Sequence, residues 1–325
     1  MKTEILKQLR ENGGYISGQE LCERFGVSRT AVWKAIRQLE EEGYKIEAVR
    51  NKGYHLLNSC DIMTKTELES RIEGAFGREV EYHETIDSTN IRAKRLAEEG
   101  AAAGTLVVSD RQEAGRGRRG RSWVSPPGEN IFMSLILRPD IPPSSASMVT
   151  LTAALAVRAG IEETAGLSAF IKWPNDIVSS GKKLCGILTE MSAEMEGVHY
   201  VVVGIGINAN IREFPEEVKD TATSLVLETG EKIIRRRLVA SIMKAFEKYY
   251  GEFIRCKDLS GLADIYNGYI VNRDKGVRVL DPNGEYTGRS LGIDENGELL
   301  VEMDSGEIRK VISGEVSVRG IYGYV

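Results

Sequence analysis

The stretch at residues 115–123, GRGRRGRSW, constrains the fold of this chain more than any other. Its first seven positions hold three glycines and four arginines, and the glycine spacing matches the dinucleotide-binding fingerprint, which requires a helix directly afterwards. Pro126, Pro127 and Gly128 predict a turn there instead. We therefore reject a Rossmann loop and predict a long basic loop, named here the arginine loop, between strands at residues 105–109 and 131–137. The sequence pattern leaves open whether this loop binds a small anion, binds nucleic acid or contacts only solvent.

Length and charge set the limits for the rest of the chain. Its 325 residues suffice for two or three domains. With 43 Lys and Arg against 48 Asp and Glu the net charge is -5, so any contact with nucleic acid has to be local. The N-terminus lacks the apolar core of a signal peptide, and no stretch approaches membrane-spanning length, so we expect a cytoplasmic protein without membrane contact. The cysteines form no C-x-x-C pair, which argues against a disulfide framework and a zinc site; they are Cys22, Cys60, Cys185 and Cys256.

The first 57 residues have the pattern of a winged helix-turn-helix. Apolar residues recur at helical spacing from Ile5 to Leu9, and Ser28 is a good N-cap for a third helix. Projection of that helix places its apolar and its basic residues on opposite sides, and in this plan the third helix enters the major groove of DNA. The predicted elements are helices at residues 1–13, 19–25 and 28–43 and wing strands at residues 44–48 and 54–57.

The outer side of the third helix and the wing carry the candidate DNA contacts. Their cations would meet phosphates, which position a domain on DNA without reading its sequence. Up to residue 57 the chain has ten Lys and Arg against eight Asp and Glu, so a winged helix that binds protein stays an alternative. The residues predicted to bind DNA are Arg29, Thr30, Trp33, Lys34, Arg37, Arg50 and Lys52.

Three polar motifs follow expected strands in the centre of the chain. The run Asp87-Ser88-Thr89-Asn90 precedes a helical segment, where its side chains could cap the helix or bind a polar ligand. In the turn KWPND at residues 172–176, Lys172 suits a phosphate and Asp176 a divalent cation, with a solvated loop as the alternative. Lys183 stands at the entrance of a further strand, in which Gly186 would allow a ligand close to the backbone.

The remaining pattern predicts an α+β sheet rather than a doubly wound one, because strands alternate with few helices. After residue 275, turn signals at residues 281–284, 295–297 and 304–306 recur so densely that a small β-barrel is expected, with a merely stabilising cap as the alternative. The other expected elements are a polar, helical joint at residues 61–77, helices at residues 145–163 and 232–253, strands at residues 82–85, 169–173, from 182, and 200–207, a polar join at residues 258–268, and C-terminal strands at residues 277–280, 299–303 and 308–312.

In order and spacing, these motifs resemble those of the bifunctional biotin-protein ligases that also repress the biotin operon, the BirA type. The resemblance rests on the run at residues 87–90, the arginine loop, KWPND, KLCGIL at residues 183–188 and GIGIN at residues 204–208. Together with the winged helix and the C-terminal β domain, it covers nearly the whole chain.

The resemblance implies three domains and a two-step reaction. The three domains are a winged helix-turn-helix at residues 1–62, a central mixed-sheet domain like that of class II synthetases at residues 63–268, and an SH3-like barrel at residues 269–325. Biotin and ATP, with Mg²⁺, would give biotinyl-5'-adenylate and pyrophosphate, and biotin would pass to a lysine of the biotin carboxyl carrier protein. Since the substrate carboxylate attacks, the protein supplies alignment and charge rather than a nucleophile.

The resemblance also implies roles for individual residues. Arg116, Arg118 and Lys183 would be catalytic, Asp176 would meet the metal, and Arg319 is a further candidate in the last domain. Apolar contacts to adenine are expected from the segment at residues 209–230, from among Phe214, Pro215 and Val218. The residues expected around biotin are Ser88, Thr89, Asn90, Gln112, Arg116, Gly117, Arg118 and Lys183. Those expected around ATP and the adenylate are Arg119, Arg121, Trp123, Lys172, Asn175, Asp176 and Asn208.

Regulation follows from the union of these parts in one chain. The adenylate would act as corepressor by favouring a homodimer, which matches an operator with two inverted half-sites. Two other classes of protein stay open: a ligand-sensing repressor without ligase activity, and a lipoate-type ligase.

Overall fold

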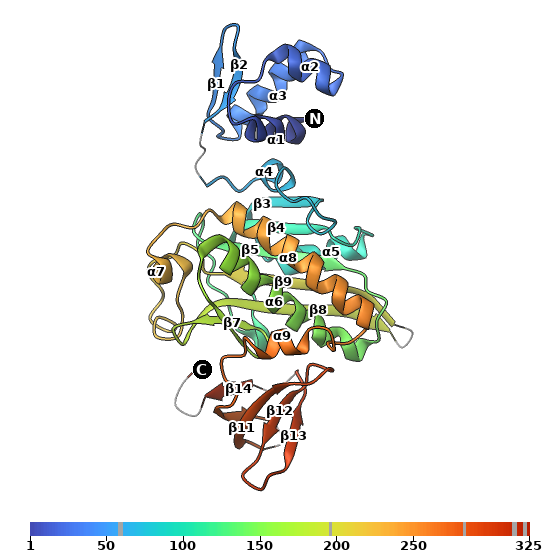
Figure 1. Ribbon diagram of the computed structural model, residues 1–325, viewed down its shortest axis with the longest axis vertical. Coiled ribbons are helices and arrows are strands. Elements are labelled where there is room, and N and C mark those ends of the chain that lie inside the picture. Colours follow the sequence, from blue (N-terminus) through green and yellow to red (C-terminus); the bar gives the residue numbers. More distant parts are fainter. Residues whose placement is uncertain (58–60, 195–196, 282–283, 314–316, 321–323) are drawn as a thin grey trace.

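The computed structural model describes residues 1–57, 61–194, 197–281, 284–313, 317–320 and 324–325. Three parts follow one another along the long axis: a helical part with a wing, a central sheet covered by helices, and a small sheet (Figure 1). Cys60, the turn residues Pro282 and Asn283, and residues 314–316 before Arg319 lie outside the described residues.

The N-terminal part is a winged helix-turn-helix, as the sequence predicts. The Ser28 hydroxyl accepts a hydrogen bond from the Ala31 amide at 3.2 Å, so it caps the third helix. That helix buries its apolar side in a separate small core. Gly53 opens the second wing strand at φ 108°, where a Cβ would lie 2.1 Å from the Ile16 carbonyl oxygen. The elements are α1 (Lys2–Asn12), α2 (Gly18–Phe25), α3 (Arg29–Glu41), β1 (Ile46–Val49) and β2 (Gly53–Leu56).

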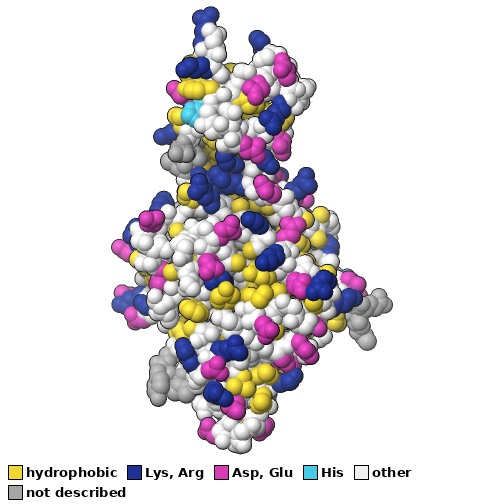
Figure 2. Space-filling model, in the orientation of Figure 1, with side chains coloured by type: hydrophobic (Ala, Val, Ile, Leu, Met, Phe, Trp, Pro, Cys, Tyr) yellow, Lys and Arg dark blue, Asp and Glu magenta, His cyan; other side chains and the backbone are white. Residues whose placement is uncertain are grey.

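Buried ion pairs attach this part to the central domain, and Figure 2 shows Lys and Arg side chains gathered where the two meet. The buried Glu67 carboxylate accepts hydrogen bonds from Arg10 and from the Tyr44 hydroxyl, both at 2.7 Å. Arg236 lies 2.9 Å from the same carboxylate, and Arg71 pairs with it as well. Because an unpaired buried carboxylate is very costly, Arg10 and Tyr44 hold the N-terminal part against Glu67, while Arg71 and Arg236 pair with Glu67 from within the central domain.

The expected helical joint at residues 61–77 is mostly wrong. Only α4 (Lys65–Glu69) is an α-helix there, capped by Thr64. Gly74 and Gly77 follow within two turns, and Gly77 has φ 79°, which no continuing right-handed helix allows.

The central domain is built on a seven-stranded mixed sheet in the order β3-β4-β5-β9-β8-β7-β6. Only β3 and β4 run parallel, which confirms the α+β prediction. The strands are β3 (Val80–Ile86), β4 (Leu106–Gln112), β5 (Ile131–Leu137), β6 (Phe170–Lys172), β7 (Asp176–Ser179), β8 (Lys182–Glu194) and β9 (Gly197–Ile207). The helices are α5 (Thr89–Glu98), α6 (Ala146–Ala165), α7 (Leu225–Thr229), α8 (Arg235–Cys256) and α9 (Ala263–Asn267), the last within the expected polar join.

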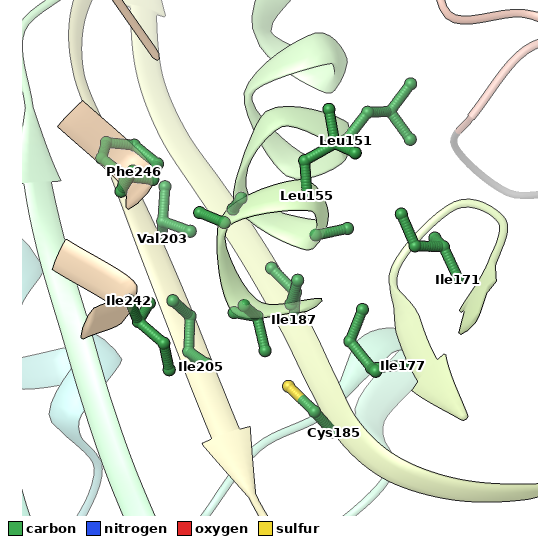
Figure 3. Close-up of a cluster of buried hydrophobic side chains, with 14 of the residues drawn as sticks. Leu151, Leu155, Ile171, Ile177, Cys185, Ile187, Val203, Ile205, Ile242 and Phe246 are labelled. Atoms are coloured by element: carbon green, nitrogen blue, oxygen red, sulfur yellow. The ribbon is translucent and has the colours of Figure 1, made fainter. Parts of the chain in front are cut away.

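The two faces of this sheet differ. On one face, alternate residues such as Val203 and Ile205 pack against α6 and α8, the latter contributing Ile242 and Phe246 (Figure 3). On the other face α5 covers Val202 and its neighbours, and next along β9 come glycines. Since successive strand residues point to opposite faces, the α5 face is left open where these glycines stand.

The expectation that no stretch approaches membrane-spanning length is wrong. Among the described residues, the helical stretch Pro143–Ala165 has the length and mean hydropathy, 1.3, of such a segment. It is the central core helix of the domain: 83% of its most apolar window is buried inside the protein.

The C-terminal part is a five-stranded antiparallel sheet in the order β13-β12-β11-β10-β14. Its hairpin at Gly297 reaches the central domain, where the Trp173 indole donates a hydrogen bond to the Gly297 carbonyl at 3.1 Å. The strands are β10 (Gly276–Leu280), β11 (Tyr286–Ile293), β12 (Leu299–Glu302), β13 (Ile308–Val311) and β14 (Ser317–Gly320), of which the sequence prediction missed β11 and β14.

Candidate active site

The candidate site lies on the open face of the central sheet, around Trp123. Gly186 of β8 and Gly206 of β9 face each other in register. A Cβ on Gly186 would lie 2.8 Å, and one on Gly206 2.7 Å, from atoms of the Trp123 ring system. Because neither glycine has a side chain, the indole packs directly against the backbone of the sheet. Trp123 lines two pockets.

The small pocket, of about 30 Å³, lies beside the N-terminus of α5. Its polar groups bond to one another: Gln112 Oε1 accepts from the Thr89 amide at 2.9 Å and from the Thr89 hydroxyl at 3.1 Å. Ser88 is the N-cap residue of α5 but forms no side-chain capping bond. The motif thus lines a pocket, and the capping alternative fails for Ser88. The lining residues are Ser88, Thr89, Asn90, Gln112, Arg116, Trp123, Leu188, Gly204, Ile205 and Gly206.

Asn90 is fixed from several sides. Its Nδ2 donates to Glu190 Oε2 at 2.8 Å and to the Leu188 carbonyl at 3.2 Å. Its Oδ1 lies 2.6 Å from the Ser134 hydroxyl. A Cβ on Gly204 would come within 2.0 Å of that Oδ1. Burial works against ionisation of Glu190, but hydrogen bonds from Lys94 and Asn90 hold its pKa below the ordinary value. Sequence reasoning missed Ser134 and Glu190, which lie within strands that carry no motif.

The large pocket, of about 240 Å³, is cationic and shares Trp123 with the small one. It receives the arginine loop, the β6–β7 turn, the start of β8 and two residues of β14. The lining residues are Gly117, Arg118, Arg119, Arg121, Ser122, Trp123, Val124, Lys172, Trp173, Pro174, Asn175, Asp176, Lys183, Asn208, Phe214, Val218, Thr221, Ala222, Val318, Arg319 and Tyr324.

Asp176 organises the charges of the large pocket. Its Oδ1 lies 2.7 Å from Lys183 Nζ and accepts from Asn175 at 3.1 Å. Burial opposes ionisation, but Lys183 and Lys172 hold the pKa of Asp176 below its ordinary value. Burial lowers the pKa of Lys172 to about 8, against the opposing effect of Asp176. The pocket thus holds a buried ammonium that titrates near neutral pH.

The arginine loop folds back on itself above the pocket. The Gly117 amide donates to the Arg121 carbonyl at 2.7 Å, and Arg119 adopts φ 58° in the turn between them. Arg118 Nη1 donates to Asn175 Oδ1 at 2.8 Å, and burial lowers the pKa of Arg118. Arg116, Arg119 and Arg121 are exposed. The loop therefore places one half-buried and three exposed guanidinium groups around the site.

Every residue predicted to meet biotin or ATP lines one of the two pockets, although their individual roles stay predictions. Gly117, Arg118 and Lys183, expected beside biotin, line the large pocket rather than the small one. Of the three apolar candidates after residue 208, Phe214 and Val218 line the large pocket. Tyr324 is a residue that sequence reasoning missed entirely.

The candidate DNA face lies far from these pockets, on α3 and the wing (Figure 1). The five predicted residues of α3 are exposed, and Trp33, at 50% exposure, carries the Arg37 guanidinium 5.4 Å from its ring centre. Arg50 and Lys52 are exposed in the wing, at whose tip Figure 2 shows basic side chains. No packing role explains so large an exposed aromatic residue.

Comparison with known proteins agrees with this architecture. Residues 82–208 match the biotin/lipoate A/B protein ligase family, residues 2–55 an HTH domain, and residues 274–319 the biotin protein ligase C terminal domain. The solved structure of biotin protein ligase from Aquifex aeolicus, in complex with biotin and ATP, is similar with a TM-score of 0.66 and 32% identity; the match covers 75% of this chain and 99% of that one. Fold and pockets thus define a biotin/lipoate-type ligase domain joined to a helix-turn-helix.

Two relatives match over nearly their full lengths. The bifunctional ligase/repressor BirA of Bacillus subtilis is 42% identical, with 98% of each chain covered. That of Escherichia coli is 31% identical, with 96% of this chain and 95% of the relative covered. The chain belongs to the family of the bifunctional ligase/repressor BirA, which confirms the resemblance seen in the sequence.

Proposed function

We propose that this protein joins biotin to ATP as biotinyl-5'-adenylate, transfers the biotin to a lysine of the biotin carboxyl carrier protein, and represses biotin genes. One observation carries the enzymatic part: Trp123 lines both a small pocket, in which Arg116 is the one charged residue among uncharged hydrogen-bonding groups, and a cationic pocket, and Lys183 lies 5.3 Å from the Trp123 ring centre. The reaction joins biotin, which has an uncharged ring system, to ATP, which has a polyphosphate. It therefore requires a surface of hydrogen-bonding groups next to a cationic one.

The small pocket suits the polar ring atoms of biotin. Thr89, Asn90 and Gln112 present amide and hydroxyl groups that can exchange their mutual hydrogen bonds for bonds to a ureido group. At about 30 Å³ the pocket is far smaller than the roughly 300–1,000 Å³ of typical small-molecule sites. Biotin therefore enters with a displacement of the Trp123 ring or of the arginine loop above it.

The large pocket suits the triphosphate and the adenylate. A carboxylate oxygen of biotin attacks the α-phosphorus of ATP, and pyrophosphate leaves with the electron pair of the broken P–O bond. Lys183 and Lys172 stabilise the negative charge that gathers on the phosphoryl oxygens, and the exposed arginines of the loop close over it. In the second step, the lysine amine of the carrier attacks the acyl carbon, and AMP leaves.

Mg²⁺ would enter with ATP rather than reside in the protein. Asp176 is the one carboxylate among the described residues that line the large pocket, and its oxygens already accept hydrogen bonds from neighbours. Elsewhere in the described chain, no group of three or more His, Cys, Asp and Glu side chains could hold a metal ion. A single carboxylate beside phosphate oxygens is a common Mg²⁺ environment, so the donor set fits a metal that ATP brings.

The repressor part rests on the exposed face of α3 and on the wing. A homodimer, formed when the adenylate orders the loops, would place two such faces on inverted half-sites of operator DNA. Because operator DNA, carrier protein and ATP share one compartment, we place the protein in the cytoplasm.

Gel shifts and sedimentation test the repressor part. Biotin plus ATP should raise both the mass in solution and the affinity for operator DNA, whereas Trp33→Ala should lower only the affinity. Glu11→Ala, at an exposed site on α1, is the matched control. An unchanged mass and DNA affinity on addition of both ligands would contradict this proposal.

A further inference from the structure

Tyr324 is an aromatic residue that lines the large pocket and has no role in the proposed reaction. Its hydroxyl donates a hydrogen bond to Asp176 Oδ2 at 2.5 Å. The Lys172 ammonium lies 4.0 Å from the centre of its ring. Tyr324 thus touches both charged residues of the KWPND turn, one through its hydroxyl and the other through its ring.

These two contacts complete the surroundings of Asp176. Lys183 and Asn175 bind Oδ1, and Tyr324 binds Oδ2, so the carboxylate has a donor on each oxygen. A hydrogen bond from a phenol to a carboxylate is charge-assisted and therefore strong and directional. With Oδ2 held by Tyr324, Oδ1 is turned toward the Lys183 ammonium.

Through these two contacts, Tyr324 influences the residues at the reacting centre. Through Asp176, Tyr324 fixes the direction of Lys183, which stands beside Trp123 where the two pockets meet. Through its ring, it covers Lys172 and contributes apolar area beside that ammonium. Burial raises the pKa of the Tyr324 hydroxyl itself, so it stays a donor throughout the neutral range.

We infer that Tyr324 is a positioning residue for adenylation: its hydroxyl fixes the Asp176 carboxylate so that Lys183 points at the reacting carboxylate and phosphate. The C-terminal segment thereby supplies part of the nucleotide site, together with Val318 and Arg319 of β14. Tyr324 acts through Asp176 and Lys172 and forms no bond with the reacting atoms.

Biotin-dependent ATP–pyrophosphate exchange tests this inference, which rests on the proposed adenylation. Tyr324→Phe keeps the ring and removes the hydroxyl, and should lower kcat about ten-fold, the usual effect of a lost hydrogen bond to a charged group. The KM for biotin should stay within about two-fold, because Tyr324 does not line the small pocket. Tyr286→Phe, on β11 near Arg309 and outside both pockets, is the matched control.

Two further variants separate positioning from mere packing. Tyr324→Leu removes the ring as well and should additionally raise the KM for ATP several-fold and shift its pH profile upward, since Lys172 is then better hydrated. In an Asp176→Asn background, Tyr324→Phe should have little further effect, because two residues that act through one bond are not additive.

The outcomes are distinct. The inference would be overturned by full additivity in the double variant or by parental kinetics in Tyr324→Phe. Faster exchange in Tyr324→Leu would also overturn it, because Tyr324 would then obstruct the nucleotide site rather than position its residues. Equal losses toward biotin and ATP together with a lower melting temperature would show a packing role and overturn it too. A parent chain without biotin-dependent exchange would instead refute the proposed function.

Discussion

The small and the large pocket share Trp123, yet they are built in opposite ways. In the small pocket, neutral side chains bond to one another, so the polar surface exists before any ligand arrives. In the large pocket, the buried Lys172 and the half-buried Lys183 lie near one carboxylate, Asp176, and three arginines of the loop are exposed beside them. The first arrangement selects a ligand by shape and hydrogen bonds. The second has an excess of positive charge that favours an anionic ligand. Because its cations already pair with Asp176, these ion pairs must rearrange when a polyphosphate binds.

The largest effect is expected at the meeting point of the two pockets. Lys183→Ala removes the ammonium that would face both the carboxylate and the phosphate, and should lower exchange by about 10²–10³, as for other charge-stabilising donors. Lys182→Ala, its neighbour on β8, is the matched control. Steady-state exchange rates with biotin check this, and a loss under ten-fold would place the reacting centre elsewhere.

A change in the small pocket should affect biotin alone. In Gly204→Ala the new methyl group would fall 2.0 Å from Asn90 Oδ1 and displace that side chain. Overpacking of this kind costs about 1–3 kcal/mol, so the KM for biotin should rise up to about 100-fold. Gly251→Ala, on α8 with no atom within 4 Å of the added methyl group, serves as the control. An equal rise in the KM for ATP would remove the distinction between the pockets.

The arginine loop should act on retention more than on formation of the adenylate. Arg118→Gly removes the bond to Asn175 and part of the lid. A charged hydrogen bond is worth about 2 kcal/mol, so biotinyl-adenylate should dissociate about 30-fold faster. Stopped-flow dissociation measures this rate. Release as slow as from the parent chain would show that the loop is no lid.

The smallest effect concerns pH in the large pocket. In the proposed function Lys172 would bind phosphate as an ammonium, and its pKa of about 8 means that this charge is present below pH 8 and lost as the pH rises through it. Between pH 7 and pH 9 the KM for ATP should therefore rise, by at most about ten-fold. In Lys172→Arg, whose guanidinium stays charged, the rise should vanish. A KM for ATP that is flat over this range in the parent would contradict the assignment.

Much of the site follows from local sequence, because its residues stand in contiguous motifs at strand ends and turns. The arginine loop, the KWPND turn and the run at residues 87–90 each left an alternative without a ligand open, and their order and spacing along the chain, through the resemblance to a family, gave them roles. Their assembly into two pockets depends on the order and register of the strands. Gly186 of β8 pairs with Gly206 of β9, and no local sequence pattern specifies the register of these two strands.

The residues that were missed explain the limit of such reasoning. Ser134 and Glu190 are ordinary strand residues that become polar partners of Asn90 only when β5 and β8 lie near α5. Tyr324 reaches Asp176 across 148 positions of sequence, a distance that periodicity cannot bridge. The sequence prediction overlooked the helical stretch Pro143–Ala165, which has the length and apolar composition of a spanning helix because it is mostly buried in the core of the domain.

Pyrophosphate exchange into ATP, run in parallel with biotin, with lipoate and with neither acid, tests the central claim most directly. A small pocket of mainly uncharged hydrogen-bonding groups that shares Trp123 with a cationic pocket predicts exchange that depends on biotin and is absent with lipoate. Exchange with lipoate alone, or none with either acid, would contradict the proposed function and the roles assigned to both pockets.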